Sequence, residues 1–240
     1  MLNVLIAGGG SGGHVAPAIT AAEVLTQQGA TVLLAHSSRK IDREMLSDST
    51  FEGIALPASP FSTTPIGFVH FCFGFLKSSQ KVRTLIKERS IGCVLATGGF
   101  VAAPALYAAR KEGCKTVLLN LDDPPGKANK LAVRWADTIL STVNCTLRDA
   151  VLIAPPLRES VINNSIESKC KATFGLLPNK MTLLITGASQ GASTINQLLP
   201  ALAIQNPSMF NGWEILHIAG TTHVEGVERA WKEANIPCKV

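Results

Sequence analysis

The sequence predicts an α/β protein built from doubly wound parallel sheets. Two observations predict this fold class: short apolar runs alternate with longer helical segments, and glycine-rich turns follow several of the runs. Continuous apolar strands separated by helices indicate a parallel sheet that is covered on both faces. In such sheets, ligands bind at the carboxyl ends of the strands. With 46% hydrophobic and 16% charged residues, the chain has the composition of a globular protein.

The expected strands are short runs rich in Val, Ile and Leu, bounded by turn residues, and the expected helices are the longer segments between them. In chain order we expect a strand at residues 2–7, a helix at 16–28, a strand at 31–35, a helix ending near residue 88, a strand at 91–96, a helix at 101–111, and strands at 115–119, 138–142 and 150–153.

A second strand, glycine turn and helix follow a break at Pro155 and Pro156. The repeated arrangement predicts two Rossmann-like domains, at residues 1–158 and 159–240. The second has roughly 80 residues, which is short for a complete doubly wound domain, so we expect it to be incomplete. Its expected elements are a strand at residues 181–186, a glycine turn at 187–192, a helix up to about residue 203, and strands at 214–219 and 237–240.

The turn after the first strand holds five glycines, Ser11 and His14 within residues 8–14. Glycines let the backbone take positive φ and approach a ligand, and the free N–H groups of the next helix attract anions. The turn therefore predicts a diphosphate-bearing substrate. His14 is expected either to face this ligand as a proton carrier or donor, or to serve only as a structural donor.

The spacing of Gly8, Gly10 and Gly13 also satisfies the dinucleotide-binding fingerprint. An NAD site needs an acidic residue at the end of the second strand, where this chain has none. Arg39 lies there instead and could hold a 2′-phosphate. An NADP-dependent oxidoreductase is therefore an alternative of a different class.

Two more turns are candidates. Gly98 and Gly99 follow the strand at 91–96 and either cradle a second phosphate or carbonyl group or allow a helix to pack closely on the strand. Asp122 and Asp123 follow the strand at 115–119, where paired carboxylates could act as a base or hold a metal. The alternative is that these two residues only form an ordinary turn before Pro-Pro-Gly.

The segment at residues 68–77 is rich in phenylalanine and is followed by Lys81 and Arg83. Such a segment with basic flanks is typical of contact with an anionic membrane surface, and the alternative is a helix buried in the core. The residues expected at the membrane are Phe68, Phe71, Phe73, Phe75, Leu76 and Lys77.

The net charge of +5 is mild and its basic residues are scattered, which argues against nucleic-acid binding and favours a phosphate substrate or an anionic membrane. The first apolar run has no basic residues before it and ends in glycine, so it is read as a strand rather than a signal peptide. No segment has the roughly twenty apolar residues that span a bilayer. We expect a cytosolic or peripheral protein.

Four motifs in order resemble those of the MurG-type glycosyltransferases, a family of the GT-B class. This family transfers N-acetylglucosamine from UDP-N-acetylglucosamine (UDP-GlcNAc) to the undecaprenyl-diphosphate-linked acceptor lipid I, making lipid II for peptidoglycan, and so serves cell-wall growth, cell shape and division. The resemblance covers almost the whole chain. The motifs are Gly-Gly-Gly-Ser-Gly-Gly-His-Val-x-Pro at 8–17, Thr-Gly-Gly-Phe-x-x-x-Pro at 97–104, Pro-Gly-x-x-Asn at 125–129, and Thr-Gly-Ala-Ser-Gln-Gly-Ala at 186–192 with Asn196.

The resemblance implies that the first domain takes the acceptor lipid and the membrane and that the second takes most of UDP-GlcNAc. It implies inversion at the sugar, no metal or other cofactor, and a peripheral location on the cytoplasmic face of the bacterial inner membrane. Ser11, Gly12 and Gly13 would face the donor, and His14 would lie beside the reacting groups. The further expected substrate contacts are Gly98, Gly99, Asp122, Arg158, Ser189 and Gln190.

Two departures from the family pattern bear on activity. Asp122 stands where the family has Asn, and either His14 or Asp122 is a candidate base. The family residues that hold uracil and ribose come after the position where this chain ends, so we expect residues 1–240 alone to have little or no transferase activity. A non-catalytic protein that binds only the membrane or a polyprenyl-diphosphate lipid is the alternative.

Overall fold

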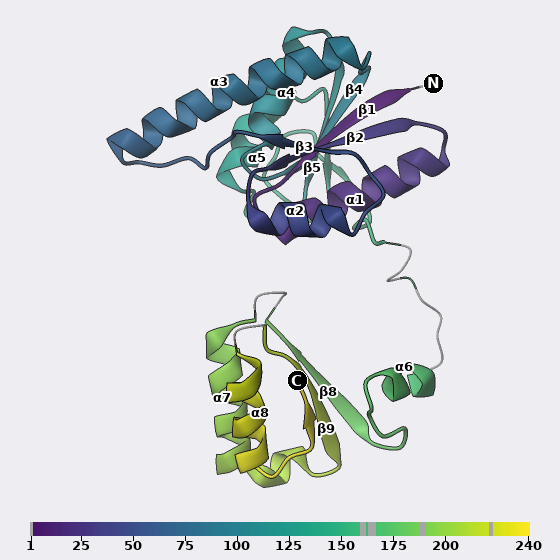
Figure 1. Cartoon of the computed structure of the whole chain (residues 1–240), viewed down its shortest axis with the longest axis vertical. Helices are drawn as coiled ribbons and strands as arrows, with labels where there is room; N and C mark the ends of the chain where they lie inside the picture. The colour runs from purple at the N-terminus through teal and green to yellow at the C-terminus, as the bar shows by residue number, and fades with distance from the viewer. Residues whose placement is uncertain (1, 159–161, 163–166, 188–190, 221–222) are drawn as a thin grey trace. The chain divides into compact units, whose positions relative to one another are not determined.

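The computed structural model describes residues 2–158, 162, 167–187, 191–220 and 223–240. The chain divides into two compact units, Met1–Ile162 and Asn163–Val240. The boundary predicted between residues 158 and 159 lies shortly before this division. Each unit has its own parallel sheet and its own apolar core (Figure 1).

The first unit is built on a seven-stranded sheet of order β3-β2-β1-β4-β5-β6-β7, in which every neighbouring pair is parallel. The chain leaves β1 toward β2 on one side and returns to β4 on the other, which makes the carboxyl ends of β1 and β4 the expected ligand site. The strands are β1 Asn3–Gly8, β2 Thr31–Ser37, β3 Gly53–Leu56, β4 Cys93–Gly98, β5 Lys115–Asn120, β6 Thr138–Ser141 and β7 Val151–Leu152.

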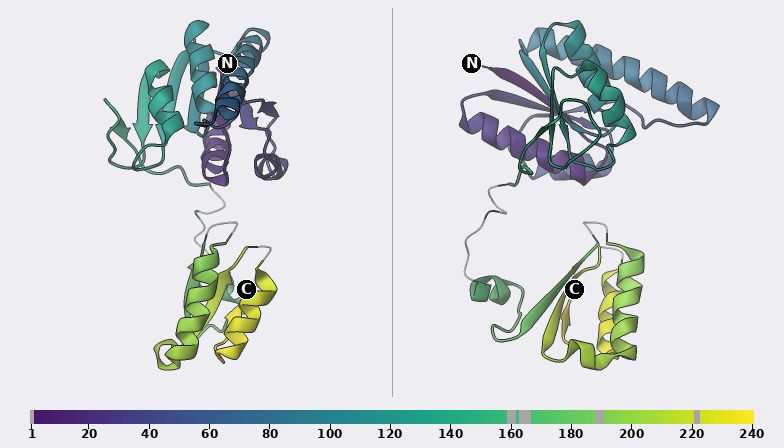
Figure 2. Two further views of the ribbon diagram at one scale, coloured as in Figure 1. Left: turned by 90° about the vertical axis from the view of Figure 1, so that its left-hand side faces the viewer. Right: turned by 180° about the vertical axis from the view of Figure 1, so that it is seen from behind.

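Helices cover both faces of this sheet (Figure 2). Successive strand residues point to opposite faces, so Leu5 and Ala7 join one core cluster with residues of α3 and α4, while Val4 and Ile6 join another with residues of α1. The doubly wound arrangement expected from the apolar runs is confirmed. The helices are α1 Gly12–Gln27, α2 Lys40–Ser47, α3 Pro65–Glu88, α4 Ala102–Lys111 and α5 Lys127–Ala132, followed by a short 3-10 helix at Val133–Trp135.

Two parts of the first unit differ from the prediction. The helix α1 begins at Gly12 rather than residue 16, because the carbonyl of Ser11 accepts the N–H groups of His14 and Val15 at 3.1 and 3.3 Å. The prediction also missed α2, β3 and α5. The helix α2 is mostly polar, α5 has only six residues, and β3 is a four-residue edge strand in which only Leu56 is fully buried.

The second unit contains a three-stranded parallel sheet of order β10-β9-β8, with α7 and α8 packed together on the same core (Figure 2). The strand β8 corresponds to β1, since a glycine turn and a helix follow each. Within the described residues β8 pairs only with β9, and its Met181 and Leu184 are more than half exposed. The elements are α6 Glu167–Thr173, β8 Met181–Thr186, α7 Ser193–Gln205, a 3-10 helix at Pro207–Phe210, β9 Trp213–Ile218, α8 Val224–Glu233 and β10 Cys238–Lys239.

A buried chain of hydrogen bonds ties the second unit together. The indole N–H of Trp231 donates to Nδ1 of His217 (3.0 Å), so the proton of the neutral ring lies on Nε2, which donates to Oδ1 of Asn196 (3.1 Å). Asn196 in turn donates from Nδ2 to the carbonyl of Ala219 (2.9 Å). Burial lowers the pKa of His217, because the surroundings disfavour the charged imidazolium.

We predict that the second unit loses stability as the pH falls below 6.5, the ordinary pKa of histidine. In that window the unfolded chain binds a proton that native His217 does not, so the loss should be at most about 1.4 kcal/mol per pH unit. The measurement is urea unfolding followed by tryptophan fluorescence between pH 7.5 and 5.5, with His217→Gln as the control. An identical pH dependence in the variant would contradict the prediction.

Candidate active site

The turns that follow β1, β4 and β5 come together at one edge of the first sheet, because these strands are neighbours and run parallel. The structure therefore brings Ser11, Gly12, Gly13 and His14 to the same edge as the turn after β4 and the loop that holds Asp122. The glycine turn after β1 leads directly into the N-terminus of α1.

The glycine turns after β1 and β4 touch each other backbone to backbone. A Cβ atom on Gly99 would run into the carbonyl oxygen of Gly9, and one on Gly98 would lie 2.5 Å from Nδ1 of His14. Gly98 and Gly99 also have positive φ values of 116° and 74°. Close packing thus accounts for both glycines, and it fixes the position of one turn relative to the other.

His14 is held in this contact by a reciprocal pair of hydrogen bonds with Thr97. The Oγ1 hydroxyl of Thr97 donates to the carbonyl of His14 (2.7 Å), and Nδ1 of His14 lies 3.2 Å from the carbonyl oxygen of Thr97. A carbonyl oxygen can only accept, so Nδ1 carries the proton in the neutral ring. This leaves Nε2 unprotonated, and no described residue hydrogen-bonds to it. The structural role predicted for His14 therefore uses Nδ1, and the role of proton carrier would use Nε2.

Asp42 on α2 is a site residue that the sequence analysis missed. Its carboxylate is fully buried, and Oδ2 accepts hydrogen bonds from the N–H of Gly10 (2.7 Å) and from the N–H and hydroxyl of Ser37 (3.0 and 2.5 Å). Arg39 donates to the carbonyl of Gly10 (2.6 Å), and its guanidinium lies 5.1 Å from the ring centroid of Phe100. Arg39, considered above for a 2′-phosphate, is therefore used to hold the glycine turn.

The loop after β5 is ordered by buried amides rather than by its carboxylates. Asn120 donates from Nδ2 to the main-chain carbonyl of Asp122 (2.8 Å) and to the hydroxyl of Ser141 (3.2 Å), while its Oδ1 accepts from Asn129 (3.0 Å). The side chains of Asp122 and Asp123 are exposed. Within the described ranges, no group of three or more His, Cys, Asp or Glu side chains is arranged to hold a metal ion.

Of the residues expected to contact the donor diphosphate, Ser189 and Arg158, only Arg158 is described. Arg158 lies in the first unit, where its guanidinium is 3.4 Å from Oε1 of Glu23 on α1 and its Nε is buried without a partner. Ser189 and Gln190 lie outside the described residues. The same turn contains Gly191, whose φ is +71° and which packs against the carbonyl of Ala219.

The aromatic helix α3 has an inner and an outer face. Phe71 and Phe75 are half-buried, and the ring of Phe75 lies 5.5 Å from that of Tyr107 and 6.0 Å from that of Trp135. The ring of Phe71 lies 5.5 Å from that of Phe61, so both residues pack partly against other side chains of the first unit. Phe73 and Leu76 are exposed, as are Phe68 and Lys77.

Two apolar residues that the sequence analysis missed complete the outer face of α3. Ile66 and Val69 are exposed and lie at helical spacing from Phe73 and Leu76, forming what we call the α3 stripe: Ile66, Val69, Phe73 and Leu76. Their periodicity, rather than the phenylalanine content, is the signal that identifies them. In the portion of the chain that the structure covers, no helix combines the length and apolar character that crossing a membrane requires.

Comparison with known proteins identifies related sequences. The model of the glycosyltransferase family 28 N-terminal domain matches residues 4–141. The UDP-N-acetylglucosamine--N-acetylmuramyl-(pentapeptide) pyrophosphoryl-undecaprenol N-acetylglucosamine transferase of Streptomyces coelicolor is 33% identical over 228 residues, which cover 91% of this chain and 62% of that protein. The protein of the same name from Leifsonia xyli is 33% identical over 227 residues, with coverages of 92% and 63%. The chain thus spans less than two thirds of the length of these relatives.

Solved structures confirm the predicted GT-B fold class. The crystal structure of MurG from Acinetobacter baumannii has a TM-score of 0.72 and 21% identity, with 100% of this chain and 68% of that chain covered. UDP-GlcNAc 2-epimerase from Neisseria meningitidis, bound to UDP-GlcNAc, has a TM-score of 0.62 and 12% identity, with coverages of 99% and 72%.

We predict that Gly99→Ala destabilises the first unit more than Gly113→Ala. Both glycines have a φ near +75°, at 74° and 77°, so both substitutions introduce the same backbone strain of roughly 1–2 kcal/mol. A Cβ on Gly113 meets nothing within 4 Å, whereas one on Gly99 collides with the backbone of Gly9. Urea unfolding should therefore show at least about 2 kcal/mol of additional loss for Gly99→Ala. Equal losses in the two variants would show that the turns do not depend on this contact.

Proposed function

The chain belongs to glycosyltransferase family 28 through its N-terminal domain, and on this premise we propose that it acts in the transfer of N-acetylglucosamine from UDP-GlcNAc to lipid I, which yields lipid II for peptidoglycan. The observation that carries the proposal is the placement of His14. Its Nδ1 is hydrogen-bonded to Thr97, and no residue in the described ranges hydrogen-bonds to its Nε2, beside an amide-rich turn at the start of a helix.

The glycine turn after β1 supplies a site for a pyrophosphate. The first N–H groups of a helix have no intrahelical acceptors, and Gly12 and Gly13 occupy the first turn of α1. A phosphate at this position is stabilised by these donors and by the positive end of the helix dipole. We propose that the first unit holds the pyrophosphate of the acceptor lipid in this way and that no metal is needed.

The transfer itself is a displacement at the anomeric carbon of the donor sugar. An acceptor hydroxyl attacks that carbon with inversion, the bond to the diphosphate oxygen breaks with its electron pair leaving on UDP, and Nε2 of His14 takes the hydroxyl proton. We assign the base to His14 because Thr97 fixes its imidazole, whereas the Asp122 carboxylate is exposed and only the main chain of that residue is held.

The second unit is proposed to bind UDP-GlcNAc at the turn after β8. Its resemblance to the turn after β1 supports this role, since both connect a parallel strand to a helix through glycines. Ser189 and Arg158 remain the proposed contacts of the donor diphosphate, and Gln190 remains a proposed substrate contact.

We also propose that the α3 stripe attaches the protein to the cytoplasmic face of the bacterial inner membrane. Four exposed apolar side chains on one helix face form a surface that favours the boundary between lipid headgroups and acyl chains. The exposed Lys77 beside the stripe and the net charge of +5 favour anionic lipids.

The assignment of the base is tested by His14→Asn, which keeps an N–H donor for the carbonyl of Thr97 but removes the basic nitrogen. We expect the transfer rate to fall at least about a hundredfold, the typical contribution of a positioned base. The assay is single-turnover transfer of radiolabelled N-acetylglucosamine from UDP-GlcNAc to a lipid I analogue, with the chain in excess over the acceptor, so that the low rate expected of residues 1–240 alone can be measured and compared between variants.

Asp122→Asn is the matched control for this assay and should change the rate less than about threefold. A wild-type rate in His14→Asn, or a large loss in Asp122→Asn, would move the base to another group. Calorimetric titration with UDP separates the enzyme from the non-catalytic alternative, because a protein that binds only the lipid shows no affinity for UDP. Binding of NADP in the same titration would favour the oxidoreductase.

Attachment through the α3 stripe is tested by Phe73→Asp. Removing a large apolar contact and adding a negative charge should weaken binding to phosphatidylglycerol vesicles at least tenfold, as measured by cosedimentation. Val24→Asp changes an exposed apolar residue on α1 and is the matched control, which should bind vesicles like the wild type. Equal losses in the two variants would indicate non-specific attraction instead of a defined surface.

A further inference from the structure

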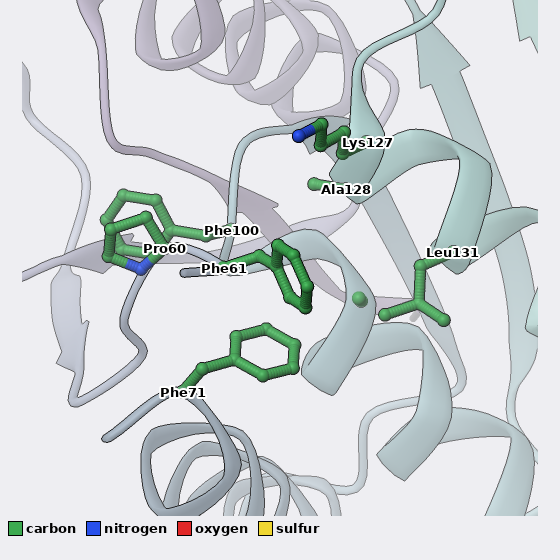
Figure 3. A pocket seen from close by; sticks show the side chains of 8 residues that line it. Pro60, Phe61, Phe71, Phe100, Lys127, Ala128 and Leu131 are labelled. Atoms are coloured by element: carbon green, nitrogen blue, oxygen red, sulfur yellow. The ribbon is translucent and has the colours of Figure 1, made fainter. Parts of the chain in front are cut away.

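The first unit contains an apolar cavity of about 470 Å³ beside the aromatic helix α3 (Figure 3). The rings of Phe61 and Phe71 face the space that Leu131 enters from α5, and Pro60 and Phe100 lie on another side. Ala103 and Ala128 complete the apolar lining, and Lys127 is its one charged residue. Both the volume and the mostly apolar wall with one polar group are typical of a small-molecule site.

One end of the cavity adjoins the glycine turn after β1. A Cβ on Gly10 would lie 2.5 Å from Cε1 of Phe100, so the ring that lines the cavity also lies against the backbone of Gly10. The guanidinium of Arg39 lies 5.1 Å from the centroid of the same ring. The Phe100 ring therefore lies between the cavity and Gly10, which belongs to the turn that leads into the proposed pyrophosphate site.

The other end of the cavity adjoins the exposed surface of α3. The ring of Phe61 lies 5.5 Å from that of Phe71 inside the cavity and 6.3 Å from that of Phe68. Phe61 and Phe68 are each about half exposed. Aromatic side chains thus connect the cavity with the exposed Phe68 on α3.

The charge around the cavity fits an anionic ligand. The ammonium group of Lys127 lies 5.9 Å from the ring centroid of Phe61, and none of the described carboxylates forms an ion pair with it. No acidic side chain lines the cavity. A ligand with an apolar chain and a phosphate head would satisfy both the walls and this cation.

We propose that the cavity binds the isoprene units of the acceptor lipid that lie next to its pyrophosphate. This inference rests on the proposed function, in which the glycine turn holds the pyrophosphate. The chain would then pass Phe100 into the cavity and leave past Phe61 and Phe68 toward the membrane, with Lys127 adding positive charge near the head. The protein would bind both the pyrophosphate of the lipid and the first isoprene units of its prenyl chain. Recognition of the acceptor would therefore include its hydrocarbon chain.

The test uses farnesyl diphosphate, a water-soluble prenyl diphosphate, and the 240-residue chain in the absence of membranes. We expect calorimetry to show that it binds at least tenfold more tightly than inorganic pyrophosphate. Ala128→Leu, which fills the cavity from a helix position, should remove this advantage while leaving pyrophosphate binding and vesicle binding unchanged. Phe73→Asp is the matched control on the outer face of α3 and should bind farnesyl diphosphate like the wild type while losing vesicle binding.

Several results would overturn the inference. In the first such result, pyrophosphate binds and farnesyl diphosphate binds no more tightly. In the second, farnesyl diphosphate binds Ala128→Leu as tightly as it binds the wild type. Either result would show that the cavity does not take the prenyl chain, and the proposed function would stand. If dodecyl diphosphate binds as tightly as farnesyl diphosphate, the cavity takes alkyl chains in general. If neither pyrophosphate nor farnesyl diphosphate binds, the pyrophosphate site of the proposed function fails together with the inference.

Discussion

The contact between the backbones of two glycine turns determines the geometry of the candidate site. Gly99 lies on the carbonyl of Gly9 with no room for a side chain, and the paired hydrogen bonds between His14 and Thr97 join the same two turns. The start of α1, the imidazole of His14 and the ring of Phe100 are all placed by this contact. The proposed pyrophosphate site and the wall of the apolar cavity are therefore parts of one rigid arrangement.

The turn is held from its other side by residues that follow β2. The peptide groups of Gly10 are bonded at both ends, the N–H by the Asp42 carboxylate and the carbonyl by the Arg39 guanidinium. A buried carboxylate is costly unless hydrogen bonds compensate it, and Oδ2 of Asp42 receives three. We infer that this carboxylate keeps the amides of the turn pointing in fixed directions, which is the kind of preorganisation that charge stabilisation requires.

The sequence was sufficient to predict the features that depend on local pattern. Apolar runs located the central strands, and the glycine clusters located the turns after β1 and β4, because those signals arise from neighbouring residues. Asp42 could not be predicted in this way, since its role comes from Gly10, 32 residues before it in the chain. Phe71 and Phe75 were selected by composition, whereas the 3.6-residue period places these half-buried rings on a different face of α3 from the exposed Ile66 and Val69.

The way in which Thr97 holds His14 has a consequence for repeated turnover. A carbonyl oxygen accepts the Nδ1–H of a neutral imidazole and of an imidazolium alike, so the bond that orients the ring survives when Nε2 gains a proton. In the proposed reaction, the ring would take a proton from the attacking hydroxyl and release it to solvent while this bond stays in place. Recovery of the starting state would then require only proton exchange with water, without rearrangement of the turn.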